Sequence, residues 1–482
     1  MARITRKREK KVKREKRVRT RIRKARGISQ KSFQELEMDI LRDAIDRATE
    51  RKAKQMVKSP EIKKIIEILE DFLRERKLVC YGGTAINNIL PEDDRFYNKN
   101  LEIPDYDFFS ADAMKDAKSL ADIYFKAGYD EVEAKSGVHA GTFKVFVNFI
   151  PIADITVMDK RIFSNIKRDS IEIDGIHYAP PDFLRMGMYL ELSRPDGDTT
   201  RWEKILKRLI LLNKNYPLKG QHTCGKTQFI REFEGSKHTD SKHADSKHER
   251  TEIYRIAKDS FIEQGLVFFG GYASSLYSKY MPKSQRRIIR NVPDFDLLSR
   301  NPLMSATILK EQLEHNDIKH VRIKVHQGVG EIMPLHYEVL VGEDTIAFIY
   351  QPSACHSYNS INIDGNIIRV ATIDTILSFY LAFLYTGKPY YDANRLLCMG
   401  EFLFNVQAKN RLEQKGVLRR FSINCYGEQK TMEDIRGEKS AKYKELKANK
   451  NSKEYQYYFL RYIPREKRKN RPRKTKKKNK DR

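Results

Sequence analysis

The sequence is poor in cysteine and tryptophan and has no long hydrophobic run, and each of these absences excludes a class of protein. Its five cysteines are scattered and form no Cys-x-x-Cys motif, which argues for a reducing compartment and against a disulfide framework or a zinc site. The longest apolar run, Ile376 to Tyr385, is too short to cross a membrane, and the charged N-terminus has no apolar signal segment. We therefore expect a soluble, intracellular protein.

Positive charge is plentiful but unevenly placed. The formal net charge is +28; residues 1–26 carry 15 lysines and arginines against two glutamates, and residues 465–482 carry 12 against two acids. We interpret these ends as a basic disordered arm and a basic tail that attract phosphate backbones without reading sequence. Solvated tails or localisation signals would have the same composition.

A length of 482 residues predicts two or three domains with a substantial buried core. Apolar residues recur at helical spacing between Phe33 and Ala48 and between Ile62 and Leu73, and Pro60 suits a helix start. We expect these helices to pack against a sheet. The predicted segments are the arm (1–26), N-terminal helices (27–76), a first domain with a helical extension (77–220), a low-complexity linker (221–252), a second domain (253–400), a C-terminal helical region (401–464) and the tail (465–482).

Two adjacent glycines, Gly82 and Gly83, follow a short apolar strand and precede a segment with helical character. Glycines at such a junction remove side chains where a phosphate could approach the backbone, and the start of the helix offers unpaired N–H groups to it. Thr84 adds a hydroxyl at the same place. These three residues are candidate nucleotide-binding residues, although a Gly-Gly pair before a helix is also ordinary turn chemistry.

Three aspartates are the candidate catalytic and metal-binding residues. Asp105 and Asp107 share one face of a predicted strand, and Asp154 is the one charge in an apolar run that predicts a neighbouring strand. Carboxylates this close repel one another unless a cation lies between them, and oxygen ligands suit a hard ion such as Mg²⁺. A charge in an apolar strand is costly unless it is paired or ligated, which favours Asp154 as the third ligand.

The Gly-Gly-Thr element, the Asp-x-Asp pair and the later lone aspartate resemble the nucleotidyltransferase superfamily that includes DNA polymerase beta and the poly(A) polymerases. The loop between the glycines and Asp105 is longer than in most of that superfamily. This departure is similar to the poly(A) polymerase catalytic subunits of large nucleocytoplasmic DNA viruses. The resemblance implies an α+β fold, Mg²⁺ or Mn²⁺ as cofactor, ATP as substrate, and non-templated addition of AMP to mRNA 3′ ends.

The resemblance also implies a mechanism, partners and a location. Asp105 and Asp107 would bridge two metal ions, and Asp154 would hold the ion nearer the RNA 3′-hydroxyl. In the related viral family, processivity comes from a partner subunit or from self-association, so a processivity subunit and a homodimer both stay open. Its viral members imply a location in the host cytoplasm or the virion.

Two other functions are compatible with these residues. Another terminal nucleotidyltransferase, with uridylyl- or CCA-adding activity, would use the same three carboxylates, and the sequence does not show how a base would be selected. A non-catalytic RNA-binding scaffold would retain the domains for their surface alone. The intact set of Asp105, Asp107 and Asp154 argues against the scaffold.

The second half of the chain repeats the first. Four motifs recur in the same order with offsets of 187 to 190 residues, which indicates a duplicated domain. They are Tyr81 to Ala85 with Phe269 to Ala273, Pro104 to Phe108 with Pro293 to Leu297, Val138 to Gly141 with Val325 to Gly328, and Ile171 to Gly175 with Ile361 to Gly365. We interpret His139 and His326 as structural residues at equivalent places. The predicted fold is therefore α+β, with two tandem nucleotidyltransferase-like mixed-sheet domains and flanking helices.

We assign catalysis to the first copy. The second copy has Tyr272 in place of Thr84, which would put a ring where a triphosphate needs room. Its candidate third carboxylate, Glu338, is spaced differently from the preceding proline than Asp154 is, and this alters the strand face unless a bulge corrects it. The second copy is therefore predicted to be inactive, with a structural or RNA-guiding role, although Asp294 and Asp296 are retained.

Three further patterns give less specific signals. The pentapeptide Ser-Lys-His-x-x occurs three times from Ser236 to Arg250 and predicts a polar linker rather than a metal site. Trp202, at helical spacing, is more typical of a core than of base stacking. Lys204, Lys207 and Arg208 on the same helix are more typical of a solvated face than of phosphate binding. Tyrosines among lysines after residue 400 suit either RNA stacking or helix packing.

Overall fold

The computed structural model describes residues 37–45, 47, 59–97, 104–220, 224, 243–281, 295–330 and 332–464. The predicted basic arm and tail, most of the linker, and Asp294 lie outside these residues. The chain divides into one unit of residues 1–63 and 98–103 and a second of residues 64–97 and 104–482, which holds both sheets. Of the first unit, the structure describes a helical segment at 37–45 and 47, whose side chains are largely exposed, and the start of α3.

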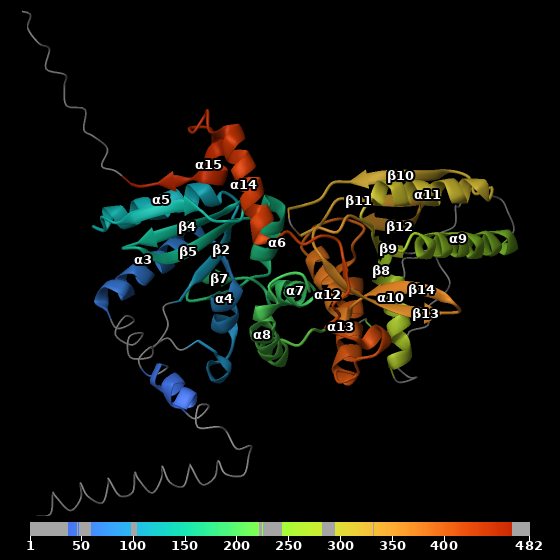
Figure 1. The fold of residues 1–482 in the computed structure, drawn as a ribbon, viewed down its shortest axis with the longest axis horizontal. Helices are drawn as coiled ribbons and strands as arrows, with labels where there is room; N and C mark the ends of the chain where they lie inside the picture. Colours follow the sequence, from blue (N-terminus) through green and yellow to red (C-terminus); the bar gives the residue numbers. More distant parts are fainter. Residues whose placement is uncertain are drawn as a thin grey trace, which may run out of the picture. The chain divides into compact units, whose positions relative to one another are not determined.

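The first domain is built on a mixed eight-stranded sheet with the order β16-β3-β4-β5-β2-β1-β7-β6 (Figure 1). At its centre, β2 runs parallel to β5, and β1 runs antiparallel to β2 and parallel to β7. The strands are β1 Val79–Tyr81, β2 Tyr106–Ser110, β3 Val132–Ser136, β4 Thr142–Val147, β5 Ile150–Val157, β6 Ile171–Ile173, β7 Ile176–Tyr178 and β16 Arg461–Tyr462.

The helices of this domain are α3 Pro60–Arg76, α4 Gly82–Ile89, α5 Ala113–Lys126, α6 Lys160–Arg168, α7 Pro181–Leu192 and α8 Trp202–Asn215. The predicted helix starting at Pro60 is confirmed as α3, which buries Leu69 and Leu73 completely. The hydroxyl of Tyr124 on α5 donates to the carbonyl of Ile65 at 2.6 Å, so α3 packs beside α5. Apolar burial on one face of each helix therefore anchors the helices around the sheet.

The second domain repeats this plan on a sheet with the order β10-β11-β12-β9-β8-β14-β13-β15. Its strands are β8 Val267–Phe269, β9 Phe295–Leu298, β10 Val321–His326, β11 His336–Val341, β12 Asp344–Tyr350, β13 His356–Ile363, β14 Asn366–Ala371 and β15 Cys425–Tyr426. Its helices are α9 His243–Glu263, α10 Gly270–Tyr277, α11 Pro302–His315, α12 Ile373–Phe383 and α13 Ala393–Lys409.

Matching backbone geometry confirms the duplication. Gly82 and Gly270, which begin α4 and α10, have φ values of +73° and +75°. In the hairpins β6–β7 and β13–β14, Asp174-Gly175 and Asp364-Gly365 both take positive φ. The hairpin and Gly-Gly motifs seen in the sequence are therefore the same structural turns in both copies, set by residues that tolerate the left-handed region.

One motif pair is not equivalent, which corrects our placement of the two histidines. β3 begins at Val132 and β10 at Val321, an offset of 189 residues. On the next strands, β4 and β11, the equivalent residues are Lys144 and Glu338, and their offset is 194. The connection after β10 is longer, so His326 aligns with Gly137, and His139 lies in the turn beyond it. The resemblance of Val138-His139 to Val325-His326 is coincidental.

The C-terminal segment contributes an edge strand to each sheet. β15 pairs with β13, and β16 pairs with β3 after α14 Met432–Leu446 and α15 Lys453–Phe459 (Figure 1). The hydroxyl of Tyr462 donates to Asp122 at 2.7 Å, and Lys439 donates to the carbonyl of Gly137 at 2.7 Å. Part of the aromatic and basic C-terminal region therefore packs on the first domain, as the helix-packing interpretation expects.

Cysteine pairing contradicts the expectation from the sequence. Cys224 pairs with Cys398 and Cys355 with Cys425, each with Cα atoms 5.3 Å apart, while Cys80 is buried and free. The prediction of no disulfides was wrong because partners 174 and 70 residues apart leave no local spacing motif. The fold brings them together from separate elements.

Helical structure begins inside the segment predicted as a linker, because α9 starts at His243. The repeat contains neither proline nor glycine, so a helix can extend into it. Among the described residues, no helix is both long and apolar enough to cross a membrane.

Candidate active site

The sheet of the first domain places four polar side chains in one row across neighbouring strands. Asp107 on β2 lies opposite Asp154 on β5, Asp154 lies opposite Lys144 on β4, and Tyr81 on β1 lies opposite Asp107. Cross-strand partners project from the same face of a sheet. Intervening residues such as Ile155 are fully buried on the other face. The structure therefore brings Asp107 and Asp154 side by side, as the sequence predicts.

Asp105 stands just before β2, two residues from Asp107. Its backbone carbonyl accepts a hydrogen bond of 2.6 Å from the hydroxyl of Thr84, which is only 3% exposed. The Thr84 side chain therefore fixes the segment that carries Asp105. The sequence alone pointed to Thr84 as a phosphate contact, and this structural contact is an additional reason for a hydroxyl at that position.

Burial and the charges of neighbouring carboxylates both act on Asp107. Burial, followed by the charges of Asp105 and Asp154, raises the pKa of Asp107 to about 7. Partial desolvation and Asp154 also raise the pKa of Asp105, although that side chain reaches the surface. Lys144 opposes both shifts, and its ammonium contacts the Asp154 carboxylate directly. Neighbouring carboxylates with raised pKa values create a strong demand for a cation.

Hydroxyl groups continue the polar row beside Asp154. The Thr156 hydroxyl lies 2.9 Å from the hydroxyl of Tyr81 and 3.2 Å from that of Thr142. Thr156 is two residues after Asp154 on β5 and so shares its face. The centre of the Tyr81 ring also lies 3.9 Å from that of Phe109, and this stacking joins β1 to β2 beside the carboxylates.

Gly82 is required by the close approach of Asp107. A Cβ at this position would lie 2.6 Å from Asp107 Oδ2, and the φ of +73° also disfavours a side chain. Gly270 stands in the same relation to Asp296 in the second domain. The glycine at the strand-to-helix junction therefore makes room for the carboxylate itself, a role that the sequence did not reveal.

Gly83 is covered by a residue that the sequence had placed on a solvated face. Both Arg208 guanidinium nitrogens, Nη1 and Nη2, lie 3.0 Å from where a Gly83 Cβ would be, and Arg208 is only 8% exposed. The Arg208 guanidinium lies over the rings of Phe96 and Tyr97 and donates to the Tyr97 hydroxyl at 2.6 Å. Among the described residues, no carboxylate forms an ion pair with it.

The two lysines of this helix that were considered together with Arg208 behave as expected. Lys204 and Lys207 are exposed, and Lys207 pairs with Glu203 at 2.5 Å. Helical periodicity could not separate Arg208 from them, because all three are long basic side chains on α8. The position of the Arg208 guanidinium beside Gly83 distinguishes it. Trp202 is half-buried and donates to the Glu191 carbonyl at 3.0 Å, as a packed residue would.

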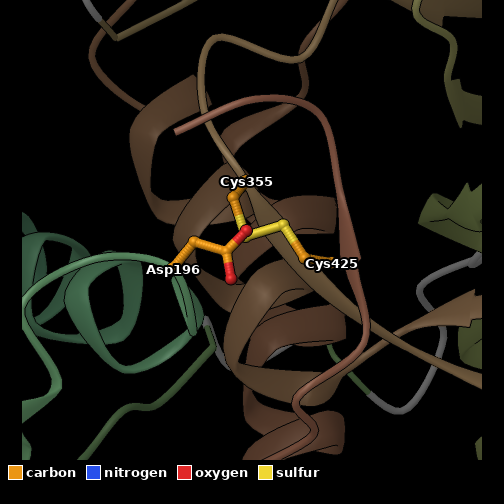
Figure 2. Close-up of side chains that lie close together, drawn as sticks. All are labelled: Asp196, Cys355 and Cys425. Atoms are coloured by element: carbon orange, nitrogen blue, oxygen red, sulfur yellow. A yellow bond between two sulfur atoms is a disulfide. The ribbon is translucent and has the colours of Figure 1, made fainter. Parts of the chain in front are cut away.

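The donor chemistry of the aspartates fits a hard divalent cation. Asp105, Asp107 and Asp154 supply oxygen ligands alone, and burial together with neighbouring carboxylates raises the pKa values of Asp105 and Asp107. The ligand atoms of these three aspartates do not all lie within 4.8 Å of one another. Within the described residues, the group that meets this distance is Asp196, Cys355 and Cys425. Figure 2 shows the latter three, but the two sulfurs are bonded to each other and are not free thiolates.

The second domain lacks the third aspartate, which corrects our choice of Glu338. Asp296 on β9 lies opposite Phe348 on β12, so Phe348 takes the place of Asp154. Glu338 on β11 lies opposite Phe348 and corresponds to Lys144. The proline used as a landmark was misleading, because Pro334 precedes β11 whereas Pro151 lies within β5, and these two strands are not equivalent. Glu338 lies 2.7 Å from His326 Nε2 and accepts from the Thr345 hydroxyl at 2.6 Å.

Tyr272 takes the place of Thr84 in the second domain. The centre of its ring lies 4.9 Å from that of Phe268 and 5.6 Å from that of Phe295, and the side chain is half-buried. That this ring would exclude a triphosphate stays a prediction, and Phe348 adds a second argument for an inactive second copy.

Comparison with known proteins gives consistent matches. Residues 67–198 match the family model described as the poly(A) polymerase catalytic subunit. The chain is 30% identical over 282 residues to a putative poly(A) polymerase catalytic subunit of Acanthamoeba polyphaga mimivirus, which covers 55% of this chain and 45% of that protein. It is also 30% identical over 171 residues to the corresponding protein of African swine fever virus (strain Badajoz 1971 Vero-adapted), covering 34% and 36%.

A solved structure extends the similarity over most of the fold. The crystal structure of the Megavirus polyadenylate synthase matches with a TM-score of 0.72 and 21% identity, covering 91% of this chain and 87% of that one. The α+β class with two mixed sheets is thereby confirmed. The chain spans less than half the length of the curated relatives it matches. The resemblance seen in the sequence is confirmed for residues 67–198.

Proposed function

We propose that this chain, whose residues 67–198 match the poly(A) polymerase catalytic subunit family, transfers AMP from ATP to the 3′-hydroxyl of RNA without a template. One observation carries the proposal: Asp107 and Asp154 lie opposite each other on parallel strands, with Asp105 two residues away, where burial and mutual repulsion create a demand for cations. The names of the viral relatives support RNA and ATP as the substrates.

Asp105, Asp107 and Asp154 are the proposed ligands of Mg²⁺ or Mn²⁺. Bound ions would lower the pKa of the RNA 3′-hydroxyl and neutralise charge on the triphosphate and pyrophosphate. Asp107 contributes its full charge only when ionised, and Thr84 keeps Asp105 in place through the backbone. The Tyr81 and Thr156 hydroxyls maintain the spacing of the strands that carry these acids.

Phosphate binding is proposed for Gly82, Gly83 and Thr84, with Arg208 as the accompanying cation. The N–H groups at the start of α4 carry a partial positive charge, and Arg208 places a buried guanidinium with no carboxylate partner among the described residues directly over Gly83. Two positive features at one place favour an anion there. A guanidinium held by two aromatic rings is also pre-organised to bind phosphate oxygens.

The first domain is the proposed catalytic domain. The second keeps the same turns and Asp296 but has Phe348 in place of the third aspartate, which leaves a metal site incomplete. A structural or RNA-guiding role is proposed for it. The description of relatives as catalytic subunits supports either a processivity partner or self-association, and light scattering during size-exclusion chromatography would distinguish them. A cytoplasmic or virion location is proposed from the same viral relatives.

The decisive experiment offers an RNA primer and one nucleotide at a time in the presence of Mg²⁺. Extension with ATP in strong preference to the other nucleotides supports polyadenylation. Preference for UTP or CTP would instead indicate a uridylyl- or CCA-adding enzyme. No extension with any nucleotide, together with salt-dependent RNA binding, would indicate a scaffold.

A further inference from the structure

Lys144 is the cation nearest the carboxylate row. It lies directly opposite Asp154 on the adjacent antiparallel strand, and its ammonium contacts Asp154 Oδ2. The Lys144 side chain is 37% exposed and that of Asp154 is 20% exposed, so the pair is only partly screened by water. Among the described residues, Asp154 is the one acceptor that contacts Lys144.

The neighbouring lysine on the same row behaves differently. Lys135 on β3 lies opposite Lys144, yet its ammonium pairs with Glu133 at 3.5 Å and lies 4.0 Å from the centre of the Phe146 ring. Two lysines on adjacent strands thus have separate partners. Lys135 belongs to a partly exposed pair on β3, beside the edge strand β16, whereas Lys144 contacts the Asp154 carboxylate.

The duplicated domain shows that Lys144 and Asp154 change together. At the equivalent positions of the second sheet, Glu338 replaces Lys144 and Phe348 replaces Asp154. Asp296 is retained opposite Phe348, while both the third acid and the lysine opposite it are absent from the second sheet. The second sheet has neither the acid nor a lysine at the equivalent position. This links the lysine to the acid rather than to the stability of the sheet.

We propose that Lys144 is a counter-cation of the carboxylate row formed by Asp107 and Asp154. In the metal-free protein its ammonium pairs with the Asp154 carboxylate, and a divalent ion displaces it when it binds there. Lys144 is in this sense a positioning residue that sets the affinity and selectivity of the site for doubly charged ions. The inference rests on the metal-binding role proposed for Asp105, Asp107 and Asp154. It does not depend on which nucleotide is transferred.

The physical basis is a competition for one carboxylate. A single ammonium neutralises one of three clustered negative charges, whereas a divalent ion neutralises two and can be shared between acids. Without Lys144, the metal-free row would repel itself more strongly and a divalent ion would have no competitor. Loss of the lysine should therefore lower the stability of the metal-free protein and increase its affinity for a divalent ion.

The test measures Mn²⁺ binding to the full chain by electron paramagnetic resonance, with no RNA or nucleotide present. Lys144→Met is expected to bind Mn²⁺ about tenfold more tightly than the unchanged protein, the scale of a partly buried ion pair. Lys135→Met, the matched control one strand away, should stay within about twofold. In an Asp154→Asn background, Lys144→Met should lose its effect, because the competition has been removed.

A thermal melt gives a second readout that is independent of affinity. In the absence of divalent ions, Lys144→Met should melt below the unchanged protein, and saturating Mn²⁺ should remove the difference. Lys144→Gln serves as a second variant should the methionine perturb folding. Equal or weaker Mn²⁺ binding by both Lys144 variants would overturn the proposal while leaving the metal site intact. Absence of any Mn²⁺ binding that depends on Asp107 would overturn both.

Discussion

The two sheets of this protein share a strand order and glycine turns but differ in what they place on one row of side chains. In the first domain the row reads Lys144, Asp154 and Asp107, and in the second it reads Glu338, Phe348 and Asp296. The backbone that carries the proposed metal ligands is therefore retained where the third acid is replaced. The fold can therefore be kept while the site changes, so a function must be inferred from the side chains in this row and not from the fold.

The largest expected effect separates the two domains by activity. Asp154→Asn should reduce RNA extension by at least about 1000-fold, because it removes a proposed metal ligand. Asp296→Asn, which alters the counterpart of Asp107 in the second domain, should change the rate by less than about threefold, because the row around it lacks the third acid. Initial rates of primer extension with ATP check both variants. Comparable losses in the two would mean that the second domain is also part of the catalytic site.

A substitution at Phe348 tests whether the second domain can hold a third acid at the position equivalent to Asp154. Phe348→Asp should lower the free energy of unfolding by about 4 kcal/mol, since it removes a fully buried ring that packs 5.0 Å from Tyr390 and buries a charge. Urea denaturation provides the measurement. Phe149→Asp is the matched control, because Phe149 is 81% exposed and should change stability by less than about 0.5 kcal/mol. A well-tolerated Phe348→Asp would show that the second row still accommodates an acid.

The raised pKa of Asp107 predicts a particular dependence of stability on pH. Since the folded pKa is about 7 and the ordinary value is 3.8, the metal-free folded state binds its proton more tightly than the unfolded state. Asp107 therefore favours folding below pH 4 relative to higher pH, and that contribution disappears as the pH rises through 7. Asp107→Asn should stabilise the metal-free protein by about 2 kcal/mol at about pH 8 and hardly at all at about pH 4.

Chemical denaturation at several pH values, in the presence of a chelator, would measure this effect. Saturating Mg²⁺ should abolish the advantage of the asparagine under alkaline conditions, because a bound ion relieves the repulsion that the asparagine removes. A stabilisation independent of pH would show that the Asp107 carboxylate is not under electrostatic stress.

The smallest expected effect concerns Arg208, the cation that covers the glycine turn of the first domain. Arg208→Met should raise the KM for ATP about tenfold, the scale of one charge-assisted phosphate contact, with a smaller change in kcat. Lys204→Met, exposed on the same helix, should leave KM unchanged. Arg208→Lys should recover part of the loss by restoring charge without the planar fork. Equal KM values for all variants would remove Arg208 from phosphate binding.

The sequence was sufficient where chemistry and local pattern coincide. Asp154 could be identified because a lone acid in an apolar strand is costly unless it has a partner, and the structure places it opposite Asp107. The glycine turns could be identified because a Gly-Gly pair follows a short apolar strand in each copy, and the first glycine of each pair takes a positive φ. The duplicated fold followed from motifs that preserve their order along the chain.

What the sequence could not reveal depends on register and on contacts between distant segments. Glu338 was chosen by counting from Pro334, but that proline precedes β11 whereas Pro151 lies in β5, so Glu338 takes the position of Lys144. Arg208 was indistinguishable from its exposed neighbours until α8 was packed against Gly83. The cysteine pairs join residues far apart in the chain, so no spacing rule could identify them.

The central claim is that the acids of the first domain alone form a divalent-metal site. Crystals of the full chain grown with Mn²⁺ and a non-hydrolysable ATP analogue would test it through the anomalous signal of manganese. We predict manganese peaks coordinated by Asp105, Asp107 and Asp154 and none at Asp296. A peak at Asp296 with the first row empty would contradict the account.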